Sequence, residues 1–428
     1  MRFVWSSKVG WVSSVRYYTS SFSWKDQTVL NLDREGRFLS VVFDNGSPDK
    51  KTYRRSLDGQ WMEIARSSSS SPRKRRILSD PSVQELYQKI KYWVERLQQD
   101  IKDQPYSVDT EWNDPLDKTN HANHLNFWLE TLGHYSWTKE LEQRQKYSQV
   151  YSKVGILPPD RYGSVVLQVT EGCVYNKCSF CTFYRGIPYR TKNAGEFKDH
   201  VRAVKNFLGE SVGRFHSIFL GDANALMVDI SSLVEIFDLV ATHFPVSSQP
   251  TAPSVIFRKK PIFAGIYSFL DVFTGKRKTQ EDFRALADKG LRMVYLGLES
   301  GSPEVLDLLN KPNREADVLK VVKNLKHGGV AVAPIFLVGP GGPTHTEEHV
   351  RKTVDLVKRM NLGPNDLIYL SPMVAMQGSP YSLLDIPSLT SEEVEEQAAL
   401  MKQKILGLYE PSGGAPKLSR YEIRDFLY

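Results

Sequence analysis

The three cysteines are the residues whose type and spacing best suit chemistry. Cys173, Cys178 and Cys181 fall within nine residues of a 428-residue chain, and no further cysteine is present for a long-range disulfide. Cysteine thiolates are ligands for iron and zinc, and four of them complete a structural zinc site or hold a [4Fe-4S] cluster. Three thiols therefore predict a metal centre with one position left open. A zinc site completed by a His or Asp ligand is the alternative.

The elements that must position these thiols alternate regularly from residue 165 onward. Short β-rich runs are followed by helices that begin at clear capping signals, such as Ser302 before Pro303. Six βα units in succession predict a parallel sheet curled into a partial barrel, with functional residues at the C-terminal ends of the strands. The predicted strands are 165–169, 217–220, 265–270, 293–298, 331–338 and 366–370, and the predicted helices are 195–207, 230–243, 280–289, 303–327 with a break, 346–360 and 391–406.

Residues that suit ligand binding stand where the predicted strands end. Cys173 comes just after the first strand, which places the cysteine loop at the mouth of the predicted barrel. A tight turn explains each glycine motif taken alone, whereas several such motifs in order along the strand ends favour a binding site. The residues at the later strand ends are Gly221, Asp222, Asp271, Glu299, Ser300, Gly339, Gly341 and Ser371.

The region from about residue 160 to the C-terminus resembles the radical S-adenosylmethionine (radical SAM) superfamily. The commonest cluster loop of that family reads Cys-x3-Cys-x2-Cys with an aromatic residue before the last cysteine, and Phe180 takes that place here. Four residues separate the first two cysteines of this chain, so its Cys-x4-Cys-x2-Cys loop is similar to an uncharacterised branch. The expected fold class is α/β, a partial (βα)6 barrel with an N-terminal β-meander and a helical accessory region.

The resemblance implies cofactors and roles for particular residues. It implies that Cys173, Cys178 and Cys181 hold a [4Fe-4S] cluster whose open iron binds S-adenosyl-L-methionine (SAM). Asp271 and Arg277 follow the third strand, and we predict that they face the substrate or the methionine carboxylate as catalytic residues; a solvated turn is the alternative. The implied cofactor contacts are Phe180 beside the cluster, Gly221 and Asp222 for the methionine amino group, Glu299 and Ser300 for the ribose, and Gly339, Gly341 and Ser371 for the adenine.

The resemblance also implies a reaction. A reduced cluster gives one electron to SAM, and the resulting 5′-deoxyadenosyl radical takes a hydrogen atom from a substrate that we expect to be a small molecule. An external one-electron donor similar to ferredoxin or flavodoxin is implied. The lack of further cysteines argues against sulfur insertion, and the lack of an Asp-x-His-x-x-Gly run argues against cobalamin-dependent methylation. Two alternatives stay open, a non-catalytic barrel that binds a cluster or zinc, and an RNA-modifying enzyme.

The formal net charge of +7 is concentrated in the N-terminal fifth of the chain. Residues 1–80 hold 15 Lys and Arg against 8 Asp and Glu, while the remaining residues hold 41 of each. A region without net charge argues against nucleic acid as a partner, because a dedicated binder needs surplus cations to neutralise phosphates. No uncharged apolar run is long enough to span a bilayer, which argues against membrane insertion.

The chain divides by composition into five segments. Residues 1–25 contain four basic residues, seven serines and no acid. This composition is typical of a mitochondrial transit peptide, so the predicted location is the mitochondrial matrix, with a disordered tail and the cytoplasm as alternatives. Residues 26–66 alternate apolar runs with turn signals and predict a small β-meander. Residues 67–78 are a Ser- and Arg-rich linker, residues 79–160 a helical accessory region, and residues 161–428 the barrel with a C-terminal extension.

Overall fold

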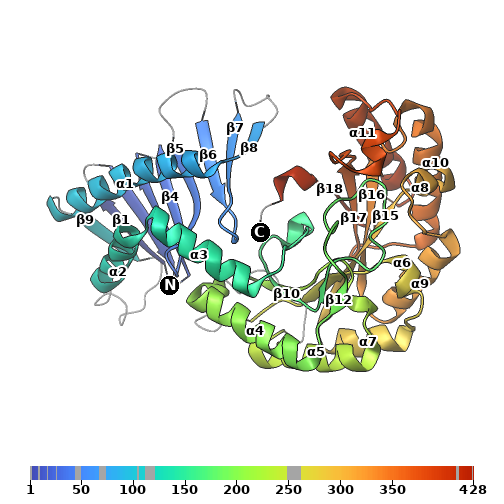
Figure 1. The fold of residues 1–428 in the computed structure, drawn as a ribbon, viewed down its shortest axis with the longest axis horizontal. Coiled ribbons are helices and arrows are strands. Elements are labelled where there is room, and N and C mark those ends of the chain that lie inside the picture. Colours follow the sequence, from blue (N-terminus) through green and yellow to red (C-terminus); the bar gives the residue numbers. More distant parts are fainter. Residues whose placement is uncertain are drawn as a thin grey trace.

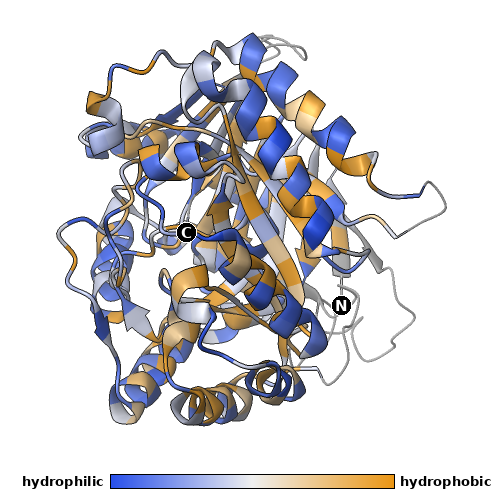
Figure 2. Cartoon of the chain, turned by 90° about the vertical axis from the view of Figure 1, so that its right-hand side faces the viewer, coloured by the Kyte–Doolittle hydropathy of each residue, from blue (hydrophilic) through white to orange (hydrophobic). Residues whose placement is uncertain are grey.

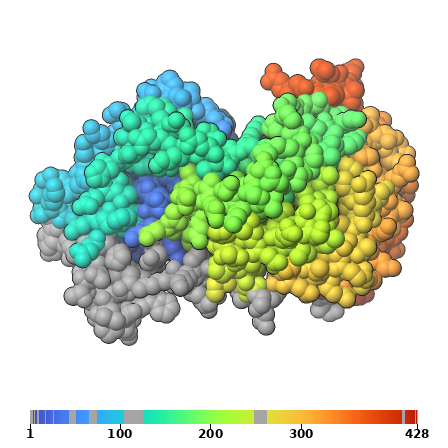
Figure 3. Space-filling model, turned by 60° about the horizontal axis from the view of Figure 1, so that its bottom comes forward, coloured from blue at the N-terminus to red at the C-terminus, as the bar shows by residue number. Residues whose placement is uncertain are grey.

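The molecule consists of two parts that lie side by side (Figure 1). One is the N-terminal module, residues 2–134, and the other is the barrel, residues 151–428; helix α3 (Trp137–Val150) connects them. The space-filling view in Figure 3 shows the N-terminal module in blue and cyan packed against the green to orange barrel. The computed structural model describes residues 2–7, 10–16, 18–25, 27–43, 50–66, 74–103, 106–110, 121–247, 262–410, 414–426 and 428.

The N-terminal module is built on an antiparallel sheet, which has nine strands within the described residues. Side chains of the second strand alternate between buried and more exposed, as expected for a strand with one face in a core. Gly36 and Gly59 turn the chain between strands with φ of 80° and 84°, a conformation that glycine adopts without strain. The strands are β1 (Arg2–Ser7), β2 (Trp11–Arg16), β3 (Thr19–Trp24), β4 (Thr28–Asp33), β5 (Phe38–Phe43), β6 (Lys50–Arg55), β7 (Trp61–Arg66), β8 (Lys74–Ile77) and β9 (Tyr106–Thr110), in the spatial order β8-β7-β6-β5-β4-β3-β2-β1-β9.

Two helices close the core of the N-terminal module. Helix α1 (Asp80–Asp103) carries apolar residues at helical spacing, so that one stripe of its surface is buried. Helix α2 (His121–His134) adds the fully buried Trp128. Their apolar faces share one hydrophobic cluster with the sheet, which is the reason that this half of the chain folds around its own core. The cluster includes Trp11, Phe22, Leu30, Phe38, Trp61, Val83, Leu86, Ile90, Val94, Leu97, Leu125 and Trp128.

The barrel is a parallel sheet wrapped by helices, as predicted. Neighbouring strands follow chain order, and the first strand is buried along its whole length, as expected for a strand covered on both faces. Figure 2 views this part and shows hydrophobic stripes running along helices whose other faces are hydrophilic. The strands are β10 (Ser164–Gln168), β13 (Ser217–Gly221), β14 (Ile266–Phe269), β15 (Leu291–Glu299), β16 (Ala331–Val338), β17 (Leu367–Pro372) and β18 (Lys417–Arg420). The helices are α4 (Ala194–Leu208), α5 (Ile230–His243), α6 (Val272–Gly275), α7 (Gln280–Asp288), α8 (Pro303–Leu308), α9 (Glu315–His327), α10 (Gly342–Met360) and α11 (Ser391–Leu406).

The elements of the N-terminal half differ from the predicted segments. Residues 1–25 supply β1, β2 and β3 of the same sheet as the predicted meander, so the sheet has no boundary at residue 25. The predicted linker 67–78 contains β8, which pairs antiparallel with β7. Strand β9 lies inside the predicted helical region 79–160 and pairs with β1. Import into mitochondria stays a prediction. None of the described helices combines the length and apolar character of a membrane span.

Candidate active site

The cysteine loop follows β10 and the short strand β11 (Thr170–Glu171) and is fastened to the segment after α8. The Ser179 N–H donates to the Leu309 carbonyl at 2.9 Å, and the Ser179 hydroxyl donates to the Leu308 carbonyl at 2.7 Å. The Asn310 side-chain amide donates to the Lys177 carbonyl at 2.8 Å. These bonds hold the backbone between the cysteines, so the positions of the thiols do not depend on the loop alone.

Two residues just past the last cysteine also contact the loop. The Arg185 guanidinium donates to the Cys181 carbonyl at 3.1 Å and to the Cys178 carbonyl at 3.3 Å. Tyr184 is buried, and burial raises its pKa well above the ordinary value. Arg185 therefore caps the loop from the solvent side, and Tyr184 packs beneath it.

All three thiols line one open cavity of about 1170 Å³ at the C-terminal ends of the strands. Glu299, at the end of β15, lies on the same wall. Most of the lining is apolar, so bound groups would be shielded from water and electrostatic interactions inside would be strengthened. The apolar and aromatic residues of the lining include Ile156, Phe180, Phe183, Phe269, Phe273, Ile335, Leu337, Met373, Met376, Tyr421 and Ile423.

Two of the thiols, those of Cys178 and Cys181, lie in surroundings that favour their protonated form in the absence of a metal. Burial raises the pKa of Cys178 to about 11, and burial also raises that of Cys181. Bound iron would supply the positive charge that makes thiolates stable here, since metal binding displaces thiol protons. Within the described residues, no group of three His, Cys, Asp or Glu side chains is arranged to hold a single metal ion.

Glu299 is paired with Lys311, a residue that the sequence analysis missed. The Lys311 ammonium lies 3.0 Å from Glu299 Oε1, with the two side chains 12% and 9% exposed. Glu299 has a φ of 66°, which is unusual for a residue other than glycine and is often associated with functional sites. Lys311 stands in the segment between α8 and α9 and belongs to no recognisable motif, so only the fold brings it to the cavity.

Asp271 lines the cavity and is fixed by its neighbours. Its carboxylate accepts from the Thr274 N–H at 2.7 Å and from the Thr274 hydroxyl at 2.8 Å, which caps α6. The Asn224 amide also donates to this carboxylate, and the Asp271 N–H donates back to Asn224 at 3.2 Å. Burial raises the pKa of Asp271, although these hydrogen bonds oppose the effect. The carboxylate therefore has a single well-defined orientation at the cavity wall.

The structure does not bring Gly221 or Asp222 to the cavity lining. Gly221 is the last residue of β13, and the Asp222 carboxylate is buried beside the cavity, where it accepts from the Gln168 amide at 3.0 Å and 3.2 Å. Burial raises its pKa to about 7. At this strand end the cavity is lined by Ala223 and Asn224 instead, because the chain turns after the strand.

Ser300 is also absent from the lining. Its hydroxyl bonds to His349 Nδ1 at 2.8 Å, and His349 Nε2 bonds to the Leu337 carbonyl at 3.0 Å. Because a carbonyl only accepts, Nε2 carries the proton, so Nδ1 accepts from Ser300. The Ser300 hydroxyl in turn accepts from the Ser302 N–H at 2.9 Å. The hydroxyl predicted to contact ribose thus ties β15, β16 and α10 together.

The predicted adenine glycines serve the turn into α10. The Gly339 N–H donates to the Gln397 side chain at 2.6 Å, and the Gly341 N–H donates to the Tyr381 hydroxyl at 2.8 Å. Neither glycine lines the cavity; the strand before them contributes Leu337. A φ of 85° at Gly339 and of 76° at Gly341 explains the glycines by backbone conformation.

The remaining predicted residues divide between the cavity and the surface. Phe180 and Ser371 line the cavity, and their contacts to the cluster and the adenine stay predictions. The Arg277 side chain is exposed and does not belong to the lining. Arg277 follows α6, and its backbone continues the turn that the Asp271 cap begins.

Comparison with known families gives one match. A family model described as the radical SAM superfamily matches residues 167–357, which include the cysteine loop and the strand ends of β10 to β16. The matched span contains six of the cavity residues predicted from the sequence, namely Cys173, Cys178, Phe180, Cys181, Asp271 and Glu299.

Curated proteins similar to this chain include tRNA-modifying enzymes. The tRNA-2-methylthio-N(6)-dimethylallyladenosine synthase of Ehrlichia canis (strain Jake) is 23% identical over 282 residues, 60% of this chain and 54% of that protein. The protein of the same name from Anaplasma marginale (strain St. Maries) is 22% identical over 260 residues, 57% of this chain and 51% of that protein. This chain thus spans about half the length of these relatives. Their names give no support to the argument against nucleic acid as a partner.

Solved structures similar to this chain are distant. Coproporphyrinogen III oxidase from Escherichia coli, a radical SAM enzyme, has a TM-score of 0.40 and 13% identity, covering 57% of this chain and 54% of its own. Methylornithine synthase has a TM-score of 0.39 and 16% identity, covering 68% of this chain and 80% of its own.

Proposed function

Because the chain belongs to the radical SAM superfamily, we propose that this enzyme holds one [4Fe-4S] cluster and SAM in the cavity and abstracts hydrogen from a small molecule. One observation supports the proposal: the three thiols line the same cavity as the carboxylates of Asp271 and Glu299 and the ammonium of Lys311. Thiolates are the ligands that such clusters take, and the 428 residues contain cysteines for one cluster. The donor set therefore fits the cofactor that the family implies.

The residues of the cavity have distinct roles in this proposal. When bound, the reduced cluster and SAM supply a 5′-deoxyadenosyl radical, whereas the protein binds, orients and shields. Glu299 is held by Lys311 through one carboxylate oxygen, so its other oxygen is available to accept from ligand hydroxyls. Asp271 is fixed by Thr274 and Asn224 and offers a carboxylate of defined orientation to the substrate.

The walls of the cavity favour a small substrate, because they include segments that lie outside the parallel strands. Ile156, Tyr421 and Ile423 line the cavity from such segments, before β10 and after β18. The Tyr421 hydroxyl donates to the Leu157 carbonyl at 2.7 Å, so these two segments are tied together next to the cavity. An apolar lining that excludes water also protects a reactive intermediate from side reactions.

A second candidate function is the modification of a tRNA base, which the names of the bacterial relatives favour. The basic residues on the edge strand β8, among them Lys74 and Arg76, provide exposed cations in the N-terminal module. Binding of tRNA that weakens steeply with salt, and that is lost when Lys74, Arg75 and Arg76 are replaced by Gln, would support this candidate. No difference between wild type and the triple variant would remove it.

Anaerobic reconstitution of the full-length chain tests the main proposal. With iron, sulfide, dithionite and SAM we expect cluster absorbance and formation of 5′-deoxyadenosine. Cys178→Ala should reduce both to background. A protein that gains the cluster absorbance but forms no 5′-deoxyadenosine would be a non-catalytic cluster carrier, which contradicts the proposal. Supplying deuterated candidate metabolites, and tRNA in parallel, identifies the substrate by deuterium transfer into 5′-deoxyadenosine.

The proposal extends to the electron donor and the location. We propose that an external ferredoxin- or flavodoxin-like protein reduces the cluster, and that the protein acts in the mitochondrial matrix. Fractionating cells and probing the mitochondrial matrix for the full-length protein tests the location. Recovery of the protein outside mitochondria would count against import.

A further inference from the structure

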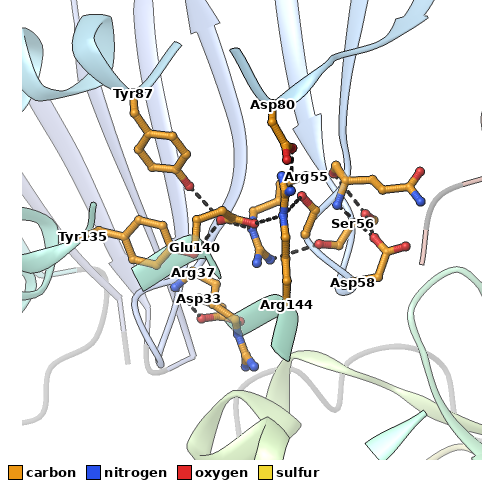
Figure 4. Close-up of polar contacts among 12 residues, drawn as sticks. Asp33, Arg37, Arg55, Ser56, Asp58, Asp80, Tyr87, Tyr135, Glu140 and Arg144 are labelled. Atoms are coloured by element: carbon orange, nitrogen blue, oxygen red, sulfur yellow. Dashed lines mark hydrogen bonds and ion pairs between the residues drawn. The ribbon is translucent and has the colours of Figure 1, made fainter. Parts of the chain in front are cut away.

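A second cavity lies between the N-terminal module and the barrel, away from the cysteines. It comprises about 430 Å³ of empty space, part of which is open to solvent, and three arginines contribute to its wall. Figure 4 shows the polar network around it, with Arg37 from the turn before β5, Arg55 from β6 and Glu140 from α3. The polar residues of its lining are Asp33, Arg37, Arg55, Ser56, Tyr162, Arg214 and Tyr428.

Each side-chain nitrogen of Arg37 has an acceptor in the protein. Its Nε donates to Asp33 at 2.8 Å, and its two terminal nitrogens donate to the Phe207 carbonyl at 3.0 Å and the Leu208 carbonyl at 3.3 Å. These carbonyls belong to the C-terminal end of α4, where a cation is favourable to the helix dipole. Arg37 is therefore a structural link between the two parts of the molecule.

Arg55 is not fully satisfied. Its Nε donates to Glu140 at 2.8 Å and its Nη1 donates to the Ser56 carbonyl at 2.9 Å. Nη2 is buried and has no acceptor among the described residues, and the side chain is only 2% exposed. A buried donor attached to a charged group is costly when it is left without an acceptor. An acceptor supplied by a ligand would remove that cost.

Arg214 is the second arginine of this cavity with a buried nitrogen that has no hydrogen-bond acceptor among the described residues. Its Nε lies 3.7 Å from Asp33 Oδ2, beyond hydrogen-bond distance, and makes no hydrogen bond among the described residues. Burial lowers the pKa of Arg214 to about 10; Asp33 opposes this shift, while the neighbouring Arg37 and Arg55 add to it. Asp33 is shared between Arg37 and Arg214, so one carboxylate serves two cations.

The acids next to the three arginines accept most of their hydrogen bonds from other donors. Asp33 also accepts from the backbone N–H groups of Glu35 and Arg37. Glu140 accepts from Arg55 and from the hydroxyls of Tyr87 and Tyr135, all within 2.9 Å. In this arrangement neither carboxylate accepts a hydrogen bond from Arg55 Nη2 or Arg214 Nε.

We propose that this cavity binds one phosphate-type oxyanion between the guanidiniums of Arg55 and Arg214. Guanidinium groups present several donors in a plane and match the oxygens of a phosphate. Arg55 belongs to β6 and Arg214 to the turn after α4, so the anion bridges the N-terminal module and the barrel. The depth of Arg55 favours a free ion or a small phosphate monoester over a polymer strand.

Calorimetric titration of the full-length protein with its cluster, at constant ionic strength, tests the proposal. We expect saturable binding of inorganic phosphate at one site per chain, with adenosine monophosphate as a parallel ligand. Tighter binding of the inorganic ion identifies a free oxyanion, and tighter binding of the nucleotide identifies a monoester; either supports the site. Absence of saturable binding of both ligands by the wild-type protein overturns it.

Variants locate the site. Arg214→Gln should weaken phosphate binding at least tenfold, because it removes one of the two guanidiniums. The buried Asp33 carboxylate keeps its ion pair with Arg37 in this variant. Arg214→Lys keeps the charge but not the planar donors, so it should also weaken binding, and it serves if the Gln variant does not fold. Arg34→Gln is the matched control: Arg34 lies at the same junction, pairs with Glu210 at 2.8 Å and does not line the cavity. Equal phosphate affinity in wild type and both Arg214 variants would overturn the proposal.

Discussion

At the residue scale, Lys311 balances the negative groups of the active-site cavity. Burial lowers its pKa, but the Glu299 carboxylate and Cys178 raise it by more, so that the ammonium remains charged. Sequence reasoning could find the cysteines, Glu299 and Asp271, because their positions at strand ends follow from the βα pattern. It could not find Lys311, because a single lysine after a short helix has no partner that the sequence reveals.

Replacing Lys311 by Met should destabilise the fold through Glu299. The two side chains are 12% and 9% exposed, so the variant leaves a carboxylate poorly hydrated and without its cation. We expect the free energy of unfolding in denaturant to fall by about 3 kcal/mol. The double variant Lys311→Met, Glu299→Gln should recover most of this loss. If the double variant is no more stable than the single one, the ion pair is not the cause.

Replacing Asp271 by Asn should separate catalysis from assembly. The Asn side chain can still accept from Thr274, so the local fold and the cluster absorbance should be retained, whereas the negative charge is lost. We expect substrate turnover to fall at least about 100-fold, as for loss of a group that positions or exchanges a proton. Asp317→Asn is the control, since Asp317 pairs with Lys276 at 2.8 Å outside the cavity. Full turnover in the Asp271 variant would exclude a catalytic role for this carboxylate.

At the scale of elements, the barrel follows closely from periodicity and capping. The bounds of α5, α11 and β16 agree with the predicted ones, since each has a clear start and a continuous apolar pattern. Helix α10 starts at Gly342, four residues before the predicted start, because the chain enters the helix through a glycine turn. Strand β18 was missed because its residues Lys417–Arg420 are mostly polar, and only pairing with β17 makes them a strand.

The attachment of the cysteine loop to α8 predicts how the cluster is retained. Asn310→Ala removes the amide that donates to the Lys177 carbonyl and places alanine at a φ of 48°, which Asn tolerates better. We expect an iron chelator to extract the cluster from the variant three- to tenfold faster, in keeping with the effect of residues that support metal ligands. Asn324→Ala, which breaks a side-chain bond to the Lys278 carbonyl in the barrel, is the control. Equal extraction rates would show that the loop holds its shape without Asn310.

At the scale of the whole molecule, the amino-acid composition of residues 1–25 was a poorer guide to the N-terminal module than the alternation of buried and more exposed residues along its strands. The serines of residues 1–25 favoured a leader peptide, yet Trp11, Val15 and Phe22 are buried in the core, and Ser14, Ser21 and Ser23 lie on the opposite, less buried face of the same strands. Serine on the open face of a strand costs little, so a Ser-rich run with buried aromatic residues can complete a sheet. Long-range pairing, such as that of β1 with β9, lies beyond any local signal.

Acid should destabilise the whole molecule through buried histidines. Burial lowers the pKa of His349 to about 4, whereas an imidazole in the unfolded chain titrates near 6.5. Between these values the unfolded chain binds a proton that the folded chain does not, so the stability present above pH 6.5 is lost as the pH falls toward 4. This amounts to ~3 kcal/mol for one group. Denaturant titrations from pH 7 to 4 should show a shallower loss for His349→Gln, which keeps an amide for Ser300 and Leu337; equal slopes would contradict this origin.

A chain that begins at residue 26 should lose the cooperative folding of the N-terminal module. It lacks β1–β3 and with them Trp11, Phe22 and Trp24, which are 3%, 0% and 7% exposed. Burial of three such side chains contributes on the order of 5 kcal/mol, and β4 would become an unpaired edge. We expect a lower unfolding temperature and aggregation, followed by circular dichroism and light scattering. Phe22→Ala in the full chain should reproduce part of the effect, with a loss of about 3 kcal/mol. A truncated chain that melts like the full one would mean that the barrel and the remaining strands are stable without this part of the sheet.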